Sequence, residues 1–362
     1  MSVRVVVQQK CLPKLALLIA VAIAATSGVR ATAQETTIDR PLGLDLYMPV
    51  PNDNPLTPEK VALGRELFSE TRLSRDGKTA CATCHVPRRA FTDGRTVSSG
   101  AFGREGARNT PTLVNRGYGK SHFWDGRAAT LEEQVLMPIQ GSQELDLYLE
   151  EAVARLRDIA AYDARFRANF GRGANAEDLA NALASYVRTI VAGDSPYDRY
   201  LMGDRDALSA AARRGLRVFR GRGNCTACHL GPNLSDEKFH NTGVAFRDGQ
   251  FLDAGRAGLT GNEADRGAFK TPTLREIERT GPYMHDGSLR SLEEVIEFYD
   301  RGGNPNPHLD PEIRPLGLAP AEKAALAEFL RSLDGMIREG VAIAQRGLRR
   351  LRASGRGVRF ST

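Results

Sequence analysis

Beyond its first 33 residues the chain has little cysteine, a single tryptophan and no long apolar run. The most apolar stretch of the whole chain lies within those first 33 residues: LALLIAVAIAA, at residues 15–25, is too short to span a bilayer comfortably. Three basic residues precede this stretch and Ala31-Thr32-Ala33 follows it, which is the pattern of a cleaved export signal. We therefore expect residues 1–33 to be removed and the mature protein to be exported and soluble, without stable membrane insertion. A retained anchor is the alternative.

Charge is spread unevenly along the chain. Without residues 1–33 the formal charge is +2, because the tail 338–362 carries +6 and residues 34–337 carry −4. The tail does not alternate its arginines with aromatic side chains, as a surface for single-stranded nucleic acid would. We interpret it as a solvated or partly disordered extension and expect no nucleic acid partner. Docking to an acidic partner or a membrane surface is the alternative.

Four cysteines remain after residue 33, and in an exported protein an even number first suggests disulfides. Their spacing favours another chemistry, because they form two C-x-x-C-H motifs made of Cys81, Cys84 and His85, and of Cys225, Cys228 and His229. In c-type cytochromes the two thiols bind the porphyrin and the histidine ligates the iron. A redox disulfide and a zinc site are alternatives. Two copies in an exported chain with no spare cysteine predict two covalently attached haem c groups.

The duplication extends beyond the cysteines. An amphipathic helix is expected before each motif, at 58–68 and 211–221, and Thr57 and Pro58 are suited to the N-cap and first position of the former. Thr-Pro-Thr-Leu follows each motif, and each unit closes with an apolar-periodic helix, at 179–190 and 323–333. We predict an all-α fold of two tandem cytochrome c-like helical domains, each with one haem. Their ranges would be 34–195 and 196–337, joined around the segment 191–204, which is rich in turn-forming residues.

The two copies differ where a haem iron would find its sixth ligand. An Asp-Gly pair occurs in both, but Phe123 in the first copy corresponds to Met284 in the second, and Trp124 corresponds to His285. A methionine thioether binds haem iron and raises its potential, so Met284 is the expected ligand. A core-filling role for Met284 and ligation by His285 are the alternatives.

Phenylalanine cannot bind iron, and no histidine lies between residues 86 and 121. Met137 is nearby in sequence, and we interpret it as pocket lining. The first haem is therefore predicted to be five-coordinate and open to a small ligand. One haem would react while the other relays electrons.

These residues resemble the bacterial di-haem cytochrome c peroxidases, whose scaffold the MauG-like di-haem enzymes share. The resemblance covers about residues 41–337. Besides the two C-x-x-C-H motifs, it rests on the segments RNTPT (108–112), FWDGRA (123–128), FKTPTL (269–274) and PYMHDG (282–287).

The resemblance implies a periplasmic enzyme that reduces hydrogen peroxide to water at the N-terminal haem. Electrons would enter at the C-terminal haem from a small cytochrome c or copper protein. Trp124 falls at the position of a tryptophan that lies between the haems in the family. A homodimer is also implied.

The resemblance also assigns residues around the first haem. Glu144 would carry a proton between the two peroxide oxygens and Gln134 would hydrogen-bond the bound species, because their order and spacing match the family. Asn109 occupies the position of an asparagine that helps to hold a calcium ion in family members.

Two departures from the family are visible. Many members carry a histidine about sixteen residues after the first motif, which caps the reactive iron until the relay haem is reduced; this chain has Ala101 there. We therefore expect a haem that is open even when fully oxidised. MauG-like enzymes place tyrosine where Met284 stands, which favours a peroxidase. A di-haem oxidase acting on a protein or organic substrate, and a plain electron carrier, are the competing functions.

Overall fold

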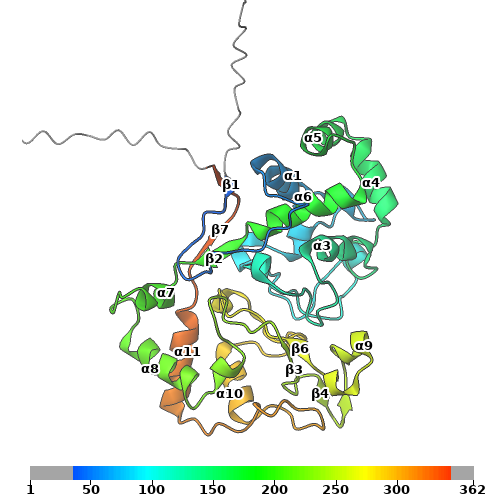
Figure 1. The fold of residues 1–362 in the computed structure, drawn as a ribbon. Coiled ribbons are helices and arrows are strands. Elements are labelled where there is room, and N and C mark those ends of the chain that lie inside the picture. Colours follow the sequence, from blue (N-terminus) through cyan, green and yellow to red (C-terminus); the bar gives the residue numbers. More distant parts are fainter. Residues whose placement is uncertain (1–35, 344–362) are drawn as a thin grey trace, which may run out of the picture. The chain divides into compact units, whose positions relative to one another are not determined.

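The computed structural model describes residues 36–343 (Figure 1). The predicted signal peptide and the tail from residue 344 lie outside the described residues. The first half of the described chain contains the helices α1 (Pro58–Phe68), α2 (Cys81–Cys84), α3 (Leu131–Gln140), α4 (Leu149–Arg157), α5 (Ala160–Phe170) and α6 (Ala176–Arg188). The second half contains α7 (Pro196–Leu201), α8 (Ala210–Arg220), α9 (Ala257–Thr260), α10 (Leu292–Asp300) and α11 (Pro320–Arg331).

The described chain is mostly helical, but it also contains short strands that the all-α expectation did not include. Four antiparallel pairs form: β1 (Thr36–Thr37) with β8 (Ala342–Ile343), β2 (Val191–Gly193) with β7 (Met336–Arg338), β3 (Phe239–His240) with β6 (Phe269–Lys270), and β4 (Phe246–Arg247) with β5 (Gln250–Phe251). Strand β2 and helix α7 occupy the segment 191–204, where the sequence indicated turns. The proposed boundary at residue 337 falls within β7, and the domain ranges stay a prediction.

The four helices expected around the haem motifs are present as α1, α6, α8 and α11. Helix α1 starts as predicted, with Thr57 as N-cap: its hydroxyl accepts a hydrogen bond from the Lys60 amide at 3.2 Å, and Pro58 occupies the first turn. Helices α6 and α11 begin three residues earlier than their apolar periodicity indicated. Their first three residues include no large apolar side chain, and α6 is capped by the Asn175 side chain.

A glycine permits close packing of the two helices that flank the haem motif in each half, α1 with α6 and α8 with α11. A Cβ atom at Gly64 in α1 would lie 1.9 Å from the Ala182 carbonyl oxygen in α6. The same distance separates a Cβ at Gly215 in α8 from the Ala325 carbonyl oxygen in α11. Side chains at these glycines would force the helices apart, and overpacking of this kind costs about 1–3 kcal/mol in well-packed cores. The duplication therefore preserves the helix crossing as well as the haem motif.

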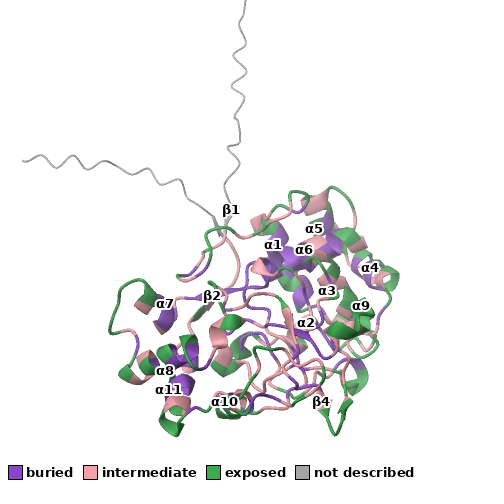
Figure 2. Ribbon diagram, turned by 60° about the horizontal axis from the view of Figure 1, so that its bottom comes forward, coloured by how far each residue is buried: buried purple, intermediate pink, exposed green. Residues whose placement is uncertain are grey.

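Each crossing lies within its own hydrophobic cluster, as the buried faces in Figure 2 show. The first cluster includes Leu67 and Leu183, and the second includes Phe219 and Phe329. None of the described helices meets the length and hydropathy of a bilayer-spanning segment.

Candidate haem sites

The first C-x-x-C-H motif lines a cavity of about 1300 Å³. Helix α2 carries Cys81 and Cys84, and the His85 amide closes the turn on the Cys81 carbonyl at 2.9 Å. All four cysteines in the described chain are free thiols. Burial raises the pKa of Cys81 to about 12 and that of Cys84 to about 11. Thiol-redox centres lower the pKa of their reactive cysteine, so these values argue against the redox alternative.

The histidine of each motif is oriented for axial ligation. The Nδ1 atom of His85 lies 2.9 Å from the Phe91 carbonyl oxygen, and Nδ1 of His229 lies 2.9 Å from that of Leu234. A carbonyl oxygen only accepts, so Nδ1 carries the proton in both rings and Nε2 keeps its lone pair. Burial also lowers the pKa of both imidazoles and thereby favours the neutral form. These residues fit a haem iron at each motif.

The second motif lines a separate cavity of about 210 Å³. Cys225 and Cys228 belong to a short helical turn, and the His229 amide bonds to the Cys225 carbonyl at 2.8 Å. Met284 lines the same cavity, together with Tyr299. The predicted ligand set of the C-terminal haem therefore lies around one cavity.

Phe123 and Met284 occupy equivalent turns. Both have left-handed backbones, with φ angles of 67° and 73°, and each turn is closed by an antiparallel bridge, His122 with Ala128 and Tyr283 with Leu289. Phe123 lines the first cavity and Met284 lines the second. The guanidinium of Arg127 lies over the Phe123 ring, 3.6 Å from its centre. The same turn thus presents a hydrocarbon ring to one cavity and a thioether to the other.

Trp124 lines both cavities. Its indole Nε1 donates to the Asn109 carbonyl at 2.9 Å, and its own carbonyl accepts a hydrogen bond from the Lys270 amide at 2.8 Å. The Asn109 amide in turn donates to the His285 carbonyl at 2.7 Å. His285 stacks on Phe269 with ring centres 3.6 Å apart and is buried. These bonds hold the Trp124 ring between the two cavities.

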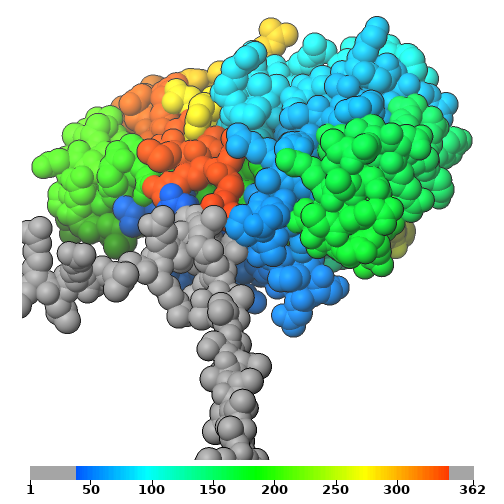
Figure 3. All heavy atoms as spheres, turned by 90° about the horizontal axis from the view of Figure 1, so that it is seen from above, coloured from blue at the N-terminus to red at the C-terminus, as the bar shows by residue number. Residues whose placement is uncertain are grey.

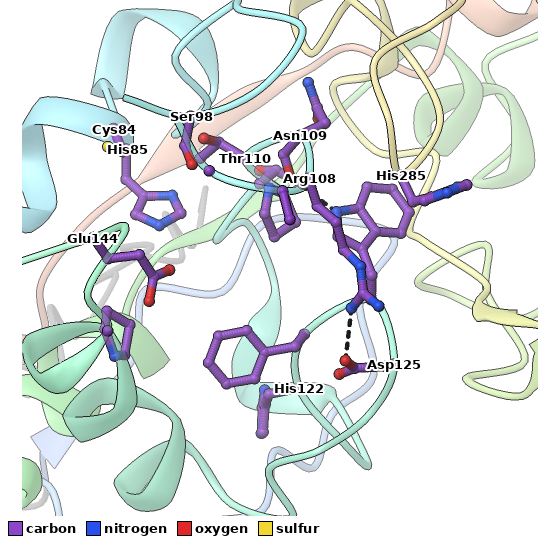
Figure 4. A pocket seen from close by; sticks show the side chains of 18 of the residues that line it. Cys84, His85, Ser98, Arg108, Asn109, Thr110, His122, Asp125, Glu144 and His285 are labelled. Atoms are coloured by element: carbon purple, nitrogen blue, oxygen red, sulfur yellow. Dashed lines mark hydrogen bonds and ion pairs between the residues drawn. The ribbon is translucent and has the colours of Figure 1, made fainter. Parts of the chain in front are cut away.

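Glu144 and Gln134 both line the first cavity. Figure 4 shows the Glu144 carboxylate and the His85 imidazole directed into the same space. The Glu144 carboxylate can take this position because residue 141 is glycine. A Cβ atom at Gly141 would lie 2.6 Å from Glu144 Oε2. Burial raises the pKa of Glu144, while Arg127 opposes that shift. A carboxylate with a raised pKa in a cavity suits proton transfer.

Ala101, where the gating histidine of the family would stand, is fully buried. Its amide donates to the Glu144 carbonyl at 2.6 Å. Gly100 permits this approach, since a Cβ there would lie 2.4 Å from the same carbonyl oxygen. The loop that would carry a capping histidine is therefore tied by its main chain to the segment that carries Glu144.

Asn109 is buried, and its side-chain amide donates to the Arg95 carbonyl at 2.7 Å. No hydrogen bond from another described residue reaches its Oδ1 atom, and carbonyl oxygens of this kind are the ligands that calcium prefers. The calcium site stays a prediction.

One set of residues was not singled out from the sequence. Arg116 and Glu237 form a buried ion pair of 2.9 Å, and Lys270 Nζ lies 3.6 Å from Glu237. Lys270 lines both cavities, and burial followed by repulsion from Arg116 lowers its pKa to about 7. In the sequence only Lys270 stands out, because it belongs to the segment FKTPTL. The spacing of residues 116, 237 and 270 gives no indication that their side chains meet.

A group of Cys228, Asp236 and His240 has metal-binding geometry. Hydrogen bonding to Cys228 and to the carboxylates of Asp310 and Asp236 raises the pKa of His240 to about 10. Both ring nitrogens of His240 already contact carboxylates, Nδ1 that of Asp310 at 2.6 Å and Nε2 that of Asp236 at 3.0 Å, and Cys228 belongs to a haem motif. This group is therefore not a competing zinc site.

Comparisons with known proteins agree with this geometry. Residues 58–206 match the family model described as di-haem cytochrome c peroxidase. The chain is 41% identical over 288 residues to the methylamine utilization protein MauG of Methylorubrum extorquens, covering 79% of this chain and 81% of that protein. It is 37% identical to cytochrome-c peroxidase IdrP1 of Denitromonas iodatirespirans, covering 87% and 92%. The crystal structure of a MauG-like protein associated with microbial copper homeostasis is similar, with 36% identity, a TM-score of 0.74 and coverage of 81% and 95%.

Proposed function

Because the chain belongs to the di-haem cytochrome c peroxidase family, which includes MauG, we propose that it reduces hydrogen peroxide at its N-terminal haem. Electrons enter at the C-terminal haem from a small cytochrome c or a cupredoxin in the periplasm. The observation that carries the proposal is the contrast between the two equivalent turns. One places Phe123 in a cavity that also contains Glu144, and the other places Met284 in the second cavity.

The four cysteines would attach two haem c groups, His85 and His229 would ligate their irons, and Met284 would be a further ligand of the C-terminal one. The N-terminal haem supplies the iron at which peroxide accepts two electrons. Glu144 takes a proton from one peroxide oxygen and returns it to the other, so that the O–O bond breaks unevenly. With two electrons and two protons, each peroxide yields two waters. Gln134 donates a hydrogen bond that positions the peroxide.

Trp124 connects the two sites because its ring borders both cavities. It would provide an aromatic contact between the groups held in the two cavities. Asn109 holds the indole in place through its backbone carbonyl, and we assign its side-chain oxygen to a calcium ion. A homodimer is the assembly that the family implies.

Steady-state turnover tests this function. We expect the holoprotein to consume hydrogen peroxide and oxidise two equivalents of reduced cytochrome c or cupredoxin for each peroxide. Consumption of peroxide without stoichiometric donor oxidation would contradict the proposal.

A MauG-like oxidase acting on a protein or organic substrate is the second candidate. The 41% identity to MauG and Ala101 in place of a gating histidine favour it. Met284 favours the peroxidase, because a methionine ligand makes a high-potential relay. Peroxide-dependent change of an added protein substrate, with little oxidation of a redox-protein donor, would establish the oxidase instead.

We predict that the fully oxidised protein contains one high-spin haem, because Phe123 offers no ligand and Ala101 offers no cap. The electron paramagnetic resonance spectrum should show one high-spin and one low-spin ferric signal. Phe123→His places a ligand at the equivalent of Met284 and should convert the high-spin signal to low spin. Two low-spin signals in the unsubstituted protein would disprove an open haem.

A further inference from the structure

Arginines are concentrated on the surface formed by α7, α8 and the turns that join them to their neighbours. We call this surface the basic face; residues 199–222 contain seven arginines and two aspartates that are not buried. The arginines are Arg199, Arg205, Arg213, Arg214, Arg217, Arg220 and Arg222. Residues 34–337 carry a net charge of −4, so the basic face is a local excess of positive charge on a part of the chain that is acidic as a whole.

Carboxylates neutralise little of this charge. Arg222 pairs with Glu322 at 3.1 Å, whereas the other six arginines form no ion pair with any residue between 36 and 343. Some of them bond to neutral groups instead: Arg213 donates to the Leu208 carbonyl at 2.9 Å, and Arg220 donates to the Tyr197 hydroxyl at 3.1 Å. Unpaired guanidinium groups leave the positive potential directed to solvent and available to an anionic partner.

The basic face also exposes apolar side chains. Leu201 is 53% exposed and Met202 is 71% exposed at the end of α7, and Leu230 is 47% exposed directly after His229. Protein interfaces commonly combine a few apolar contacts with arginine and a charged rim. Figure 3 shows the light-green segment that contains α7 and α8 at the molecular surface beside orange α11. This combination favours a protein partner over free anions.

The basic face adjoins the C-terminal haem motif. Helix α8 ends at Arg220, and Gly223, Asn224 and Cys225, which follow after two residues, line the second cavity. Ala227 between the two cysteines is exposed. A redox protein bound to α8 would therefore hold its redox centre close to the second C-x-x-C-H motif, which would carry the relay haem.

We propose that the basic face docks an acidic redox protein, a small cytochrome or cupredoxin with a carboxylate-rich surface, which reduces the C-terminal haem. This inference rests on the proposed function. Each docking event transfers one electron from the reduced partner to the relay haem, and two events supply the two electrons that one peroxide consumes. Opposite charges steer such encounters and raise the association rate, an effect that salt screens.

The test uses the holoprotein with two reduced probes of opposite charge, an acidic plastocyanin and a basic mitochondrial cytochrome c. The variant R214E/R217E reverses two exposed charges on α8. The control K78E/R88E makes the same total charge change at exposed positions in the N-terminal half, outside the basic face. Haem absorption spectra confirm that all three proteins carry both groups.

We expect kcat/KM for plastocyanin to fall about tenfold or more in R214E/R217E, to change little in K78E/R88E, and to fall as salt increases. The basic cytochrome c should be a poor donor that improves in R214E/R217E. A small-molecule reductant, ascorbate with tetramethylphenylenediamine, should support equal peroxide turnover in all three proteins. Equal loss of plastocyanin turnover in both variants would mean a general charge effect and would overturn the docking surface.

The remaining outcomes separate the two proposals. If the small-molecule reductant supports no peroxide turnover in any of the three proteins, the proposed function fails. If it does support turnover but plastocyanin is no better than the basic cytochrome c, the function stands and the docking proposal fails. Binding to phosphatidylglycerol vesicles that is lost in R214E/R217E, with unchanged donor kinetics, would assign the basic face to a lipid surface instead and also overturn the proposal.

Discussion

Glu144→Gln should lower kcat for peroxide reduction by about 10²–10⁴-fold, the usual contribution of a positioned proton-transfer group. The carboxylate points into the first cavity, into which the His85 ring is also directed (Figure 4), and glutamine keeps its shape without accepting the proton. The Ala101 amide bonds to the main-chain carbonyl of residue 144, so the substitution leaves the loop anchored. Both haem spectra should therefore be unchanged. Stopped-flow measurement of peroxide reduction checks this result.

The pH dependence gives a second readout at the same position. Glu144 accepts a proton only when ionised, and burial raises its pKa. Activity of the unsubstituted enzyme should therefore rise with pH through a value above the usual glutamate range, and Glu144→Gln should abolish that rise. Glu150→Gln, at an exposed position in α4, is the matched control and should leave kcat and the pH profile intact. Normal turnover in Glu144→Gln would remove Glu144 from the mechanism.

Met284→Leu should lower the reduction potential of the C-terminal haem by more than about 0.1 V, a fraction of the roughly 0.8 V that axial ligands span. Leucine keeps a similar volume but has no atom that binds iron. The low-spin ferric signal should become high-spin, and turnover with a redox-protein donor should fall at least about tenfold as the relay becomes harder to reduce. Spectroelectrochemical titration measures the potential directly.

Met336→Leu is the control for this substitution, because Met336 is 56% exposed in β7. It should change neither the potential nor the spectrum. A low-spin signal that persists in Met284→Leu would show that another side chain ligates the iron, and His285 is the candidate. Its ring stacks on Phe269 at 3.6 Å, so His285→Gln in the same background would then be needed to open the site.

Features that depend on neighbouring residues were predictable from the sequence. The Thr57 cap and Pro58 start of α1 are confirmed because capping involves residues only three positions apart. The helix pairs around each haem motif are confirmed for a similar reason, since apolar periodicity records which face is buried. The starts of α6 and α11 were placed too late, because first turns without a large apolar side chain give no apolar periodicity. The ligand and catalytic assignments stay predictions until spectra and variants test them.

Features that depend on pairing across the chain were not predictable. Segment 191–204 contains turn-forming residues, yet β2 forms there because β7 pairs with it from the far end of the described chain. Arg116, Glu237 and Lys270 meet only after folding. The need for glycine at position 141 follows from the direction of the Glu144 side chain, which a linear pattern does not record.

The contrast between Phe123 and Met284 separates what the sequence determines from what the tertiary structure determines. The sequence alone determined that the turn is duplicated and that only one copy offers an iron ligand, because both facts concern residue chemistry at matched positions. The family resemblance implied a place for Trp124 between the haems and for Glu144 at the first one, but only the tertiary structure shows that Trp124 borders both cavities and that Glu144 faces the first. That unpaired arginines adjoin the second cavity is visible in the tertiary structure alone. Those relations are distances between segments far apart along the chain, and packing of the two halves sets them.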